Sequence, residues 1–335
     1  MADLELRLDR LDHLPGAMAR TAAKDVRSLF PESALITLEG RNKQPLFVSA
    51  LVHGNETVGW EALKKLQAWM AHHPLPRSLI IFIGNVRAAE LQTRMVPGRP
   101  DYNRIWLGGG NTPEHRLADE VKQIVKAANP FAAIDLHNNT GANPLYALVH
   151  TDDPAHLQLN SLFSPHAMLT HNPPGTCSEA MSAFCPAITA ECGHSGVAAN
   201  EEAAFNLVLD VLHLDHWRGA PDRPLDVYTV QGRMLISPDA AMTFEHGAPG
   251  DIEFPASLEK WNFFERPAGS TFARLLNGGT PLRVETETGQ DVTDICFSRE
   301  GDRLVLKRDF TPSMLTVNED AIRADCLGYL MERTG

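Results

Sequence analysis

Residues 46–69 read LFVSALVHGNETVGWEALKKLQAW, and this stretch decides the fold predicted for the first part of the chain. The apolar run Leu46–Val52 predicts a buried strand, HGNE predicts a loop, and Val58–Trp69 has the apolar spacing of a helix. The alternation continues with predicted strands and helices at Leu79–Ile83, His115–Ala128, Ala132–Leu136, Ala187–Cys192 and Ala203–Leu214. Strands that alternate with helices indicate an α/β fold with a mostly parallel mixed sheet and helices on both faces.

The pattern changes after a proline-bearing linker at residues 218–224. Beyond it, alternating polar and apolar residues are separated by Gly, Pro and Asp, at Asp226–Ile236, Pro281–Thr288 and Arg303–Lys307. This pattern is typical of a β-rich domain with little helix. The length of 335 residues also suits two domains. We therefore predict an α/β domain over residues 1–218 and a smaller C-terminal β domain over residues 219–335.

The charge balance argues against polyanionic partners. The chain has 30 basic and 42 acidic residues, for a net charge of −12, and residues 127–217 contain no Lys or Arg. We therefore expect no nucleic acid and no membrane surface as partner. The N-terminal segment MADLELRLDRLDHLPG lacks the apolar core of a signal peptide, and the longest apolar runs are far shorter than the ~20 residues of a membrane span. Five cysteines without a CxxC pair fit the reducing cytoplasm and make a cysteine zinc site unexpected.

Imidazole and carboxylate side chains occur where the predicted strands end. His53 and Glu56 follow the first of these strands, His137 comes directly after Ala132–Leu136, and Glu191 closes a later strand. Ligands bind α/β sheets at the carboxyl ends of strands. Two histidines and one glutamate form a known ligand set of catalytic zinc, so His53, Glu56 and His137 are candidate ligands of one Zn2+ per chain. Glu191 then remains as a carboxylate suited to act as general base.

Four motifs occur in an order that resembles a known family. They are HGNE at residues 53–56, DYNR at 101–104, DLHNNTG at 135–141, and Glu191 within ITAECG. The sequence resembles succinylglutamate desuccinylases and aspartoacylases, which belong to the zinc carboxypeptidase-like superfamily. The resemblance covers roughly residues 45–200, with a weaker similarity in the C-terminal domain. It implies a zinc amidohydrolase that cleaves the amide bond of a small N-acyl amino acid.

The resemblance also implies roles for further residues, besides those of the two histidines and two glutamates above. It assigns Arg87 to the oxyanion that develops in the transition state, and Asn103 with Arg104 to the carboxylate of the substrate. These residue types suit the roles. A guanidinium matches a carboxylate with its planar fork, and a donor aimed at the developing oxyanion acts where charge appears.

The sequence departs from the family pattern in the region that binds the acidic substrate. The family has an arginine about ten residues before its catalytic glutamate, and Met181 stands at that position here, with Glu179 as the nearby charged residue. A second substrate carboxylate would meet an apolar thioether and a repelling acid. We therefore expect an amino acid with a neutral or cationic side chain, with Glu179 as partner of an ammonium group. The family's C-terminal tyrosine also has no counterpart near Val317–Glu319, where Ser313 and Met314 stand.

The sequence leaves other functions open. A zinc carboxypeptidase acting on short peptides would use the same chemistry, and a zinc-binding module without catalysis would keep the ligands alone. A serine or cysteine hydrolase would be insensitive to chelators. The complete set of ligands, base and arginines argues against the non-catalytic module. For the oligomeric state a homodimer is the default expectation, and other divalent metals also suit a His₂Glu site.

Overall fold

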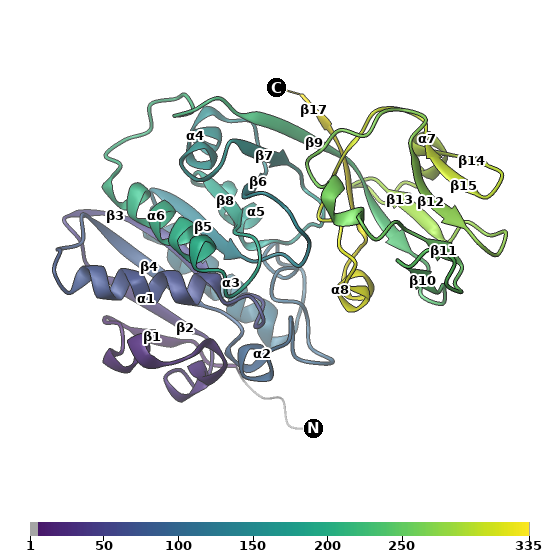
Figure 1. Cartoon of the computed structure of the whole chain (residues 1–335). Coiled ribbons are helices and arrows are strands. Elements are labelled where there is room, and N and C mark those ends of the chain that lie inside the picture. Colours follow the sequence, from purple (N-terminus) through teal and green to yellow (C-terminus); the bar gives the residue numbers. More distant parts are fainter. Residues whose placement is uncertain (1–5, 335) are drawn as a thin grey trace. The chain divides into compact units, whose positions relative to one another are not determined.

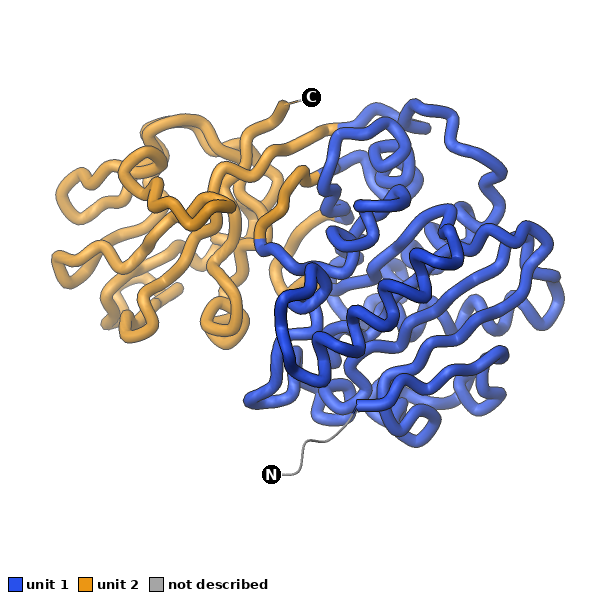
Figure 2. Tube along the Cα trace, turned by 180° about the vertical axis from the view of Figure 1, so that it is seen from behind, with its two compact units in different colours: residues 1–138, 145–167, 173–225 blue, residues 139–144, 168–172, 226–335 orange. Residues whose placement is uncertain are grey.

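The computed structural model describes residues 6–334, which form two compact units (Figures 1 and 2). Unit 1 comprises residues up to 138 together with 145–167 and 173–225. Unit 2 comprises residues 139–144, 168–172 and the chain from 226 onward. The periodicity of the sequence suggested one boundary after residue 218 and contained no signal for the two short inserts of unit 2.

The sheet of unit 1 is mixed and mostly parallel. Its strand order is β1 (Asp9–Leu11), β2 (Ala34–Leu38), β4 (Arg77–Ile83), β3 (Asn42–Ala50), β5 (Ala132–His137), β8 (Ala187–Glu191) and β6 (Tyr146–Val149). The central strands β4, β3, β5 and β8 are parallel to one another, and β2 and β6 run antiparallel to their neighbours β4 and β8. The predicted α/β class is therefore confirmed. β7 (His166–Leu169) crosses the boundary at residue 167.

Helices cover both faces of this sheet (Figure 1). They are α1 (Val58–Met70), α2 (Val86–Leu91), α3 (Pro113–Ala127), α4 (Pro154–Phe163), α5 (Cys177–Ser182) and α6 (Ala198–His213), preceded by the 3₁₀ turns Gly16–Arg20 and Ala23–Ser28. On one face α1 approaches so closely that a Cβ added at Gly59 would lie 2.8 Å from the Cβ of Ala50. On the other face, α3 and α5 pack against Phe47 and Ala133 in one apolar cluster.

The strand register places two rows of polar residues side by side near the carboxyl ends of β3, β5 and β8. Ser49 of β3 pairs with Asp135 of β5, which pairs in turn with Thr189 of β8. Two residues further along, His137 pairs with Glu191. Because side chains two apart on a strand share a face, Asp135 and His137 lie on the same side of the sheet, and this is the side covered by α5.

Unit 2 is β-rich. A five-stranded sheet has the order β10 (Met242–Thr243), β11 (Ile252–Glu253), β12 (Thr271–Leu275), β15 (Arg303–Leu306) and β14 (Phe297–Glu300). Apart from it, β9 (Asp226–Ile236) pairs with β13 (Leu282–Glu285) and β17 (Gly328–Arg333), and β17 pairs with β16 (Thr311–Ser313). The remaining elements are the 3₁₀ turn Leu258–Trp261, α7 (Thr293–Cys296) and α8 (Glu319–Ala324). The predicted β-rich pattern is confirmed, and a cluster of phenylalanines and aliphatic residues forms the core.

The cysteines and the lengths of the helices can be compared with the sequence over residues 6–334. All five cysteines are buried free thiols. Among these residues, no helix combines the length and the apolar composition that a membrane crossing requires.

Candidate metal centre

The HGNE turn brings His53 and Glu56 to the same side of the chain. The backbone N–H of Glu56 donates to the carbonyl of His53 at 3.2 Å and closes the turn. Gly54 lies against α2, where an added Cβ would be 2.1 Å from the carbonyl carbon of Ala88. Only glycine fits there, so the turn and α2 hold each other in place.

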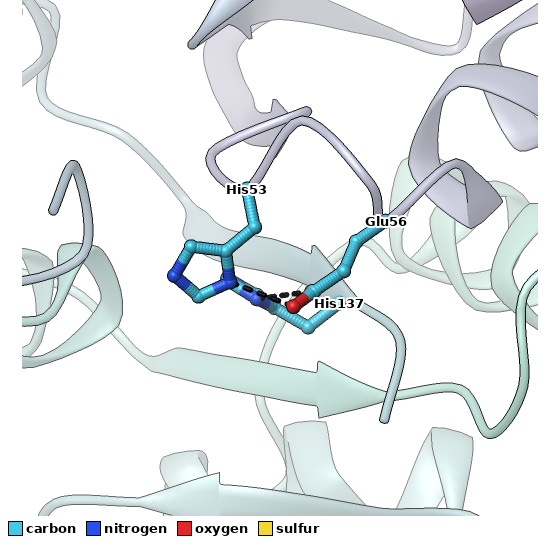
Figure 3. A group of neighbouring side chains, drawn as sticks. All are labelled: His53, Glu56 and His137. Carbon is cyan, nitrogen blue, oxygen red and sulfur yellow. Dashed lines mark hydrogen bonds and ion pairs between the residues drawn. The ribbon is translucent and has the colours of Figure 1, made fainter. Parts of the chain in front are cut away.

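Three candidate ligand side chains converge from this turn and from the end of β5 (Figure 3). One carboxylate oxygen of Glu56 lies 2.7 Å from Nδ1 of His53, and the other lies 2.8 Å from Nδ1 of His137. The candidate ligand atoms of the three residues all lie within 4.8 Å of one another. Two imidazole nitrogens and a carboxylate oxygen are the donors that a catalytic zinc site uses, so the residues fit this metal.

The outer nitrogens of both histidines are held by carboxylates. Nε2 of His137 donates to Asp135 at 2.8 Å, and Nε2 of His53 donates to Asp101 at 3.1 Å. When Nε2 keeps the proton, the lone pair of Nδ1 is free to bind a metal ion, which then replaces the hydrogen bond between Nδ1 and Glu56. Such outer partners orient metal-binding histidines and fix their tautomer.

The electrostatics of the cluster follow from burial and opposite charges. Burial alone would raise the pKa of Glu56, but His53 and His137 lower it well below its ordinary value. Burial likewise opposes ionisation of Asp101, yet His53 and two arginines lower the pKa of this carboxyl strongly. Burial disfavours the charged form of His137, and Asp135 with Glu56 outweigh it and raise its pKa. The carboxylates of Glu56 and Asp101 therefore stay ionised and available as acceptors.

Glu191 ends β8 directly beside His137. The two residues are paired in the parallel register, and the N–H of Cys192 donates to the carbonyl of His137 at 2.9 Å. Glu191 is 6% exposed. Burial raises the pKa of the Cys192 thiol, and the nearby carboxylates of Glu191 and Glu56 raise it further. A carboxylate thus stands next to the candidate ligands, whereas the adjacent cysteine stays protonated and is a poor nucleophile.

The DYNR loop contacts this centre through Asp101, a residue whose role the sequence reasoning missed. Asp101 accepts hydrogen bonds from His53, from the backbone N–H of Asn103 at 2.8 Å and from the guanidinium of Arg94 at 3.0 Å. Arg104 donates to the carbonyl of Asn103 at 2.8 Å. The side-chain oxygen of Asn103 accepts from the N–H of Cys177, at the start of α5, at 3.0 Å. The loop is therefore tied both to a candidate metal ligand and to a helix.

The structure connects Arg94, rather than Arg87, to the centre. The guanidinium of Arg87 makes a two-nitrogen contact with the carboxylate of Glu32, which raises the pKa of Arg87. Arg94 instead bonds Asp101, which bonds His53. The sequence carried one usable signal for Arg94: it stands seven residues before Asp101 in the same connection.

Glu179 and Met181, expected near the substrate, take part in the local structure of α5. Thr176 caps this helix by accepting from the N–H of Glu179 at 3.2 Å, and the carboxylate of Glu179 accepts from the N–H of Gly175 at 2.7 Å. The arrangement is similar to a capping box, except that the donor to Glu179 is the residue before the N-cap Thr176. Met181 is fully buried in the apolar cluster beneath α5, so its side chain lies in the core and not at an accessible surface.

Fold and site together describe an α/β protein with a His-Glu-His centre at the carboxyl ends of parallel strands. A family model, the succinylglutamate desuccinylase/aspartoacylase catalytic domain, matches residues 42–215, more than half of the chain. The chain belongs to this family.

Solved structures share the fold at low sequence identity. A succinylglutamate desuccinylase/aspartoacylase from Rhodobacter sphaeroides is 16% identical with a TM-score of 0.61, and the match covers 89% of this chain and 88% of that one. Murine aminoacylase 3 is 18% identical with a TM-score of 0.61, covering 88% and 97%. A succinylglutamate desuccinylase from Vibrio parahaemolyticus is 16% identical with a TM-score of 0.58, covering 88% and 82%. A comparison with curated protein sequences found no significant match.

Proposed function

We propose that the protein is a zinc-dependent deacylase that hydrolyses the amide bond of N-acyl amino acids. The observation that carries this proposal is the convergence of His53, Glu56 and His137, with Glu191 paired beside His137. Membership of a family named for two deacylases supports the same activity. His53 and His137 would hold one zinc ion through Nδ1, and Glu56 through its carboxylate.

When bound, zinc would polarise the scissile carbonyl and lower the pKa of an attacking water toward about 7. Glu191 takes a proton from this water and later gives it to the leaving amine, as general base and then general acid. Its place beside His137, one of the candidate ligands, supports this role. Asp101 and Asp135 hold the two histidines in the tautomer that ligation needs.

An arginine stabilises the oxyanion in this proposal. The contacts favour Arg94, because it is joined to His53 through Asp101, whereas the role first expected for Arg87 conflicts with its bond to Glu32. Removal of one oxyanion donor costs about 10²–10³ in rate. Variants of the two arginines therefore distinguish the assignments.

Asn103 and Arg104 bind the carboxylate of the substrate in this proposal. The bonds from Asn103 to Asp101 and Cys177 support it, because they hold the loop at a fixed place beside the centre. The amino-acid side chain is neutral or cationic in this proposal, because the segment where the family has its arginine for the acidic substrate lies within residues 127–217, which contain no Lys or Arg. Glu179 is the acid available near it, although Gly175 already donates to one of its oxygens.

The proposed setting is the cytoplasm, with a small molecule as substrate and with neither nucleic acid nor membrane as partner. The five buried free thiols and the net charge of −12 support this setting. A homodimer is proposed as the default state.

Amine release from a panel of N-acetyl and N-succinyl amino acids tests the function. The panel includes acidic, neutral and basic side chains and short peptides, with zinc-loaded protein. We expect turnover of neutral or basic acyl amino acids, and a loss of about 10²–10⁴-fold in the Glu191→Gln variant with zinc still bound. Activity confined to peptides would identify a carboxypeptidase instead. Full activity after chelation, or in Glu191→Gln, would refute the mechanism.

A further inference from the structure

One buried hydroxyl, that of Ser49, lies beneath the candidate metal centre. The other buried residues of its strand, β3, are apolar. Ser49 stands in β3 between Val48 and Ala50, and its exposed fraction is 0%. A hydroxyl in such a place destabilises the fold unless it is hydrogen bonded. Its oxygen lies 2.6 Å from Oδ1 of Asp135 and 3.6 Å from Sγ of Cys177.

The direction of each hydrogen bond around Ser49 follows from the chemistry of its partners. The carboxylate of Asp135 only accepts, so it receives the O–H of Ser49 on Oδ1 and the Nε2–H of His137 on Oδ2. The lone pairs of Ser49 then face the thiol of Cys177, a weak donor. Burial keeps this thiol protonated because it raises the pKa of Cys177, and Asp135 adds to the effect.

We propose that Ser49 is a positioning residue for the metal centre, acting through Asp135 on His137. The inference rests on the proposed metal site. One oxygen of Asp135 accepts from Ser49 and the other accepts from His137. The bond from Ser49 therefore sets the rotation of the carboxylate, and the carboxylate in turn sets the orientation of the His137 imidazole. Asp135 is 1% exposed. Without the hydroxyl of Ser49, its Oδ1 would be buried with no hydrogen-bond donor, and the carboxylate would rotate toward a different donor.

Cys177 has a separable part in this arrangement. Its thiol ends the hydrogen-bond chain at Ser49, while its backbone N–H holds Asn103 in the DYNR loop. A Cys177→Ala variant removes the thiol and keeps the backbone bond. Because a thiol is a weak donor, we expect this variant to weaken zinc binding less than threefold, whereas loss of the Ser49 hydroxyl has the larger effect.

The test measures zinc affinity by competition with a chromophoric chelator, and the thermal midpoint of the metal-free protein as the second readout. Outer partners of metal-binding histidines contribute about 10–100-fold to affinity. Ser49 acts on His137 through Asp135 and not directly, so for Ser49→Ala we expect zinc affinity to fall by about tenfold. For Ser49→Thr, which keeps the hydroxyl, we expect it to fall by less than about threefold. Ser161→Ala is the matched control: this equally buried hydroxyl donates to Gln158 and accepts from the N–H of Asp222.

The outcomes separate this inference from the proposed function. Zinc affinity of Ser49→Ala within twofold of the unmodified protein would overturn the positioning role and leave the metal site standing. Equal affinity losses in Ser49→Ala and Ser161→Ala would also overturn it, because the effect would then be one of general stability. Failure of the unmodified protein to bind one zinc per chain would refute the metal site itself, and the positioning role with it.

Discussion

Replacement of Asp101 by Asn tests whether the DYNR loop belongs to the metal centre. The carboxylate accepts from Nε2 of His53 at 3.1 Å and from the N–H of Asn103 at 2.8 Å on one oxygen, and from Arg94 at 3.0 Å on the other. An amide has one accepting oxygen and one donating nitrogen. If its oxygen faces His53, its NH₂ opposes the guanidinium of Arg94. If it is turned, His53 must accept on Nε2, and the proton moves to the nitrogen needed for the metal.

Asp135→Asn provides the matched comparison. The oxygen of the new amide can accept from Nε2 of His137, and its NH₂ can donate to the oxygen of Ser49, because a hydroxyl also accepts. This variant therefore loses a charge but no hydrogen-bond partner. Outer partners of ligating histidines are worth about 10–100-fold in metal affinity, which corresponds to about 1.4–2.8 kcal/mol. We expect Asp101→Asn near the upper end of this range and Asp135→Asn near the lower end.

Zinc competition with a chelator at constant pH measures both dissociation constants. The thermal midpoints of the metal-free variants show whether either substitution disturbs the fold. Asp135→Asn losing as much affinity as Asp101→Asn, or more, would refute the hydrogen-bond argument. An Asp101→Asn protein that binds zinc like the unmodified chain would remove the DYNR loop from the centre altogether.

Three further predictions follow from single contacts. Arg94→Ala should lower kcat/KM by about 10²–10³ and Arg87→Ala by less than tenfold, and the reverse order would return the oxyanion role to Arg87. Gly54→Ala should lower the free energy of unfolding by about 1–3 kcal/mol, measured by urea titration, because its Cβ would overlap α2; unchanged stability would mean that the helix moves freely. Burial raises the pKa of Cys185 from 9.0 to about 12, so the folded chain keeps this proton longer than the unfolded chain. The contribution of this thiol to the free energy of unfolding is full below pH about 9. It falls by about 1.4 kcal/mol per pH unit as the pH rises from about 9 toward about 12, and Cys185→Ala should flatten that slope in unfolding titrations.

Periodicity predicted the elements of unit 1 that are long and apolar. Leu79–Ile83 and Ala132–Leu136 are buried on both faces, so nearly every residue is apolar, and the observed strands extend these ranges by only one or two residues. The convergence of the candidate ligands was predictable for a related reason. His53 and Glu56 lie in the connection after β3, His137 is the last residue of β5, and parallel strands place their carboxyl ends at one edge of the sheet.

Short elements carried too little pattern to place their side chains. α5 has six residues, too few for periodicity to show which of its faces is buried, and Met181 proved to be core. Glu179 follows Thr176 by three residues, which is the spacing of a capping box, and this local signal could have shown its role at the helix start. A charged residue near a site is thus as readily a cap as a substrate partner.

The geometry of the centre depends most on contacts between loops that are distant in sequence, which no periodic pattern reports. Asn138 is an example: its side chain accepts from the N–H of Val58 at 3.0 Å and from the hydroxyl of Ser195 at 2.7 Å, and it donates to the carbonyl of Gly193 at 2.7 Å. One amide thereby joins the loops that follow β3, β5 and β8. In a sequence, such a residue is only a polar neighbour of a histidine. Asn138 is only 6% exposed, so the loss of any one of its hydrogen bonds would leave a buried polar atom without a partner and destabilise the fold. Polar residues that interrupt an apolar pattern near the end of a strand therefore indicate where the loops around the candidate site are held together.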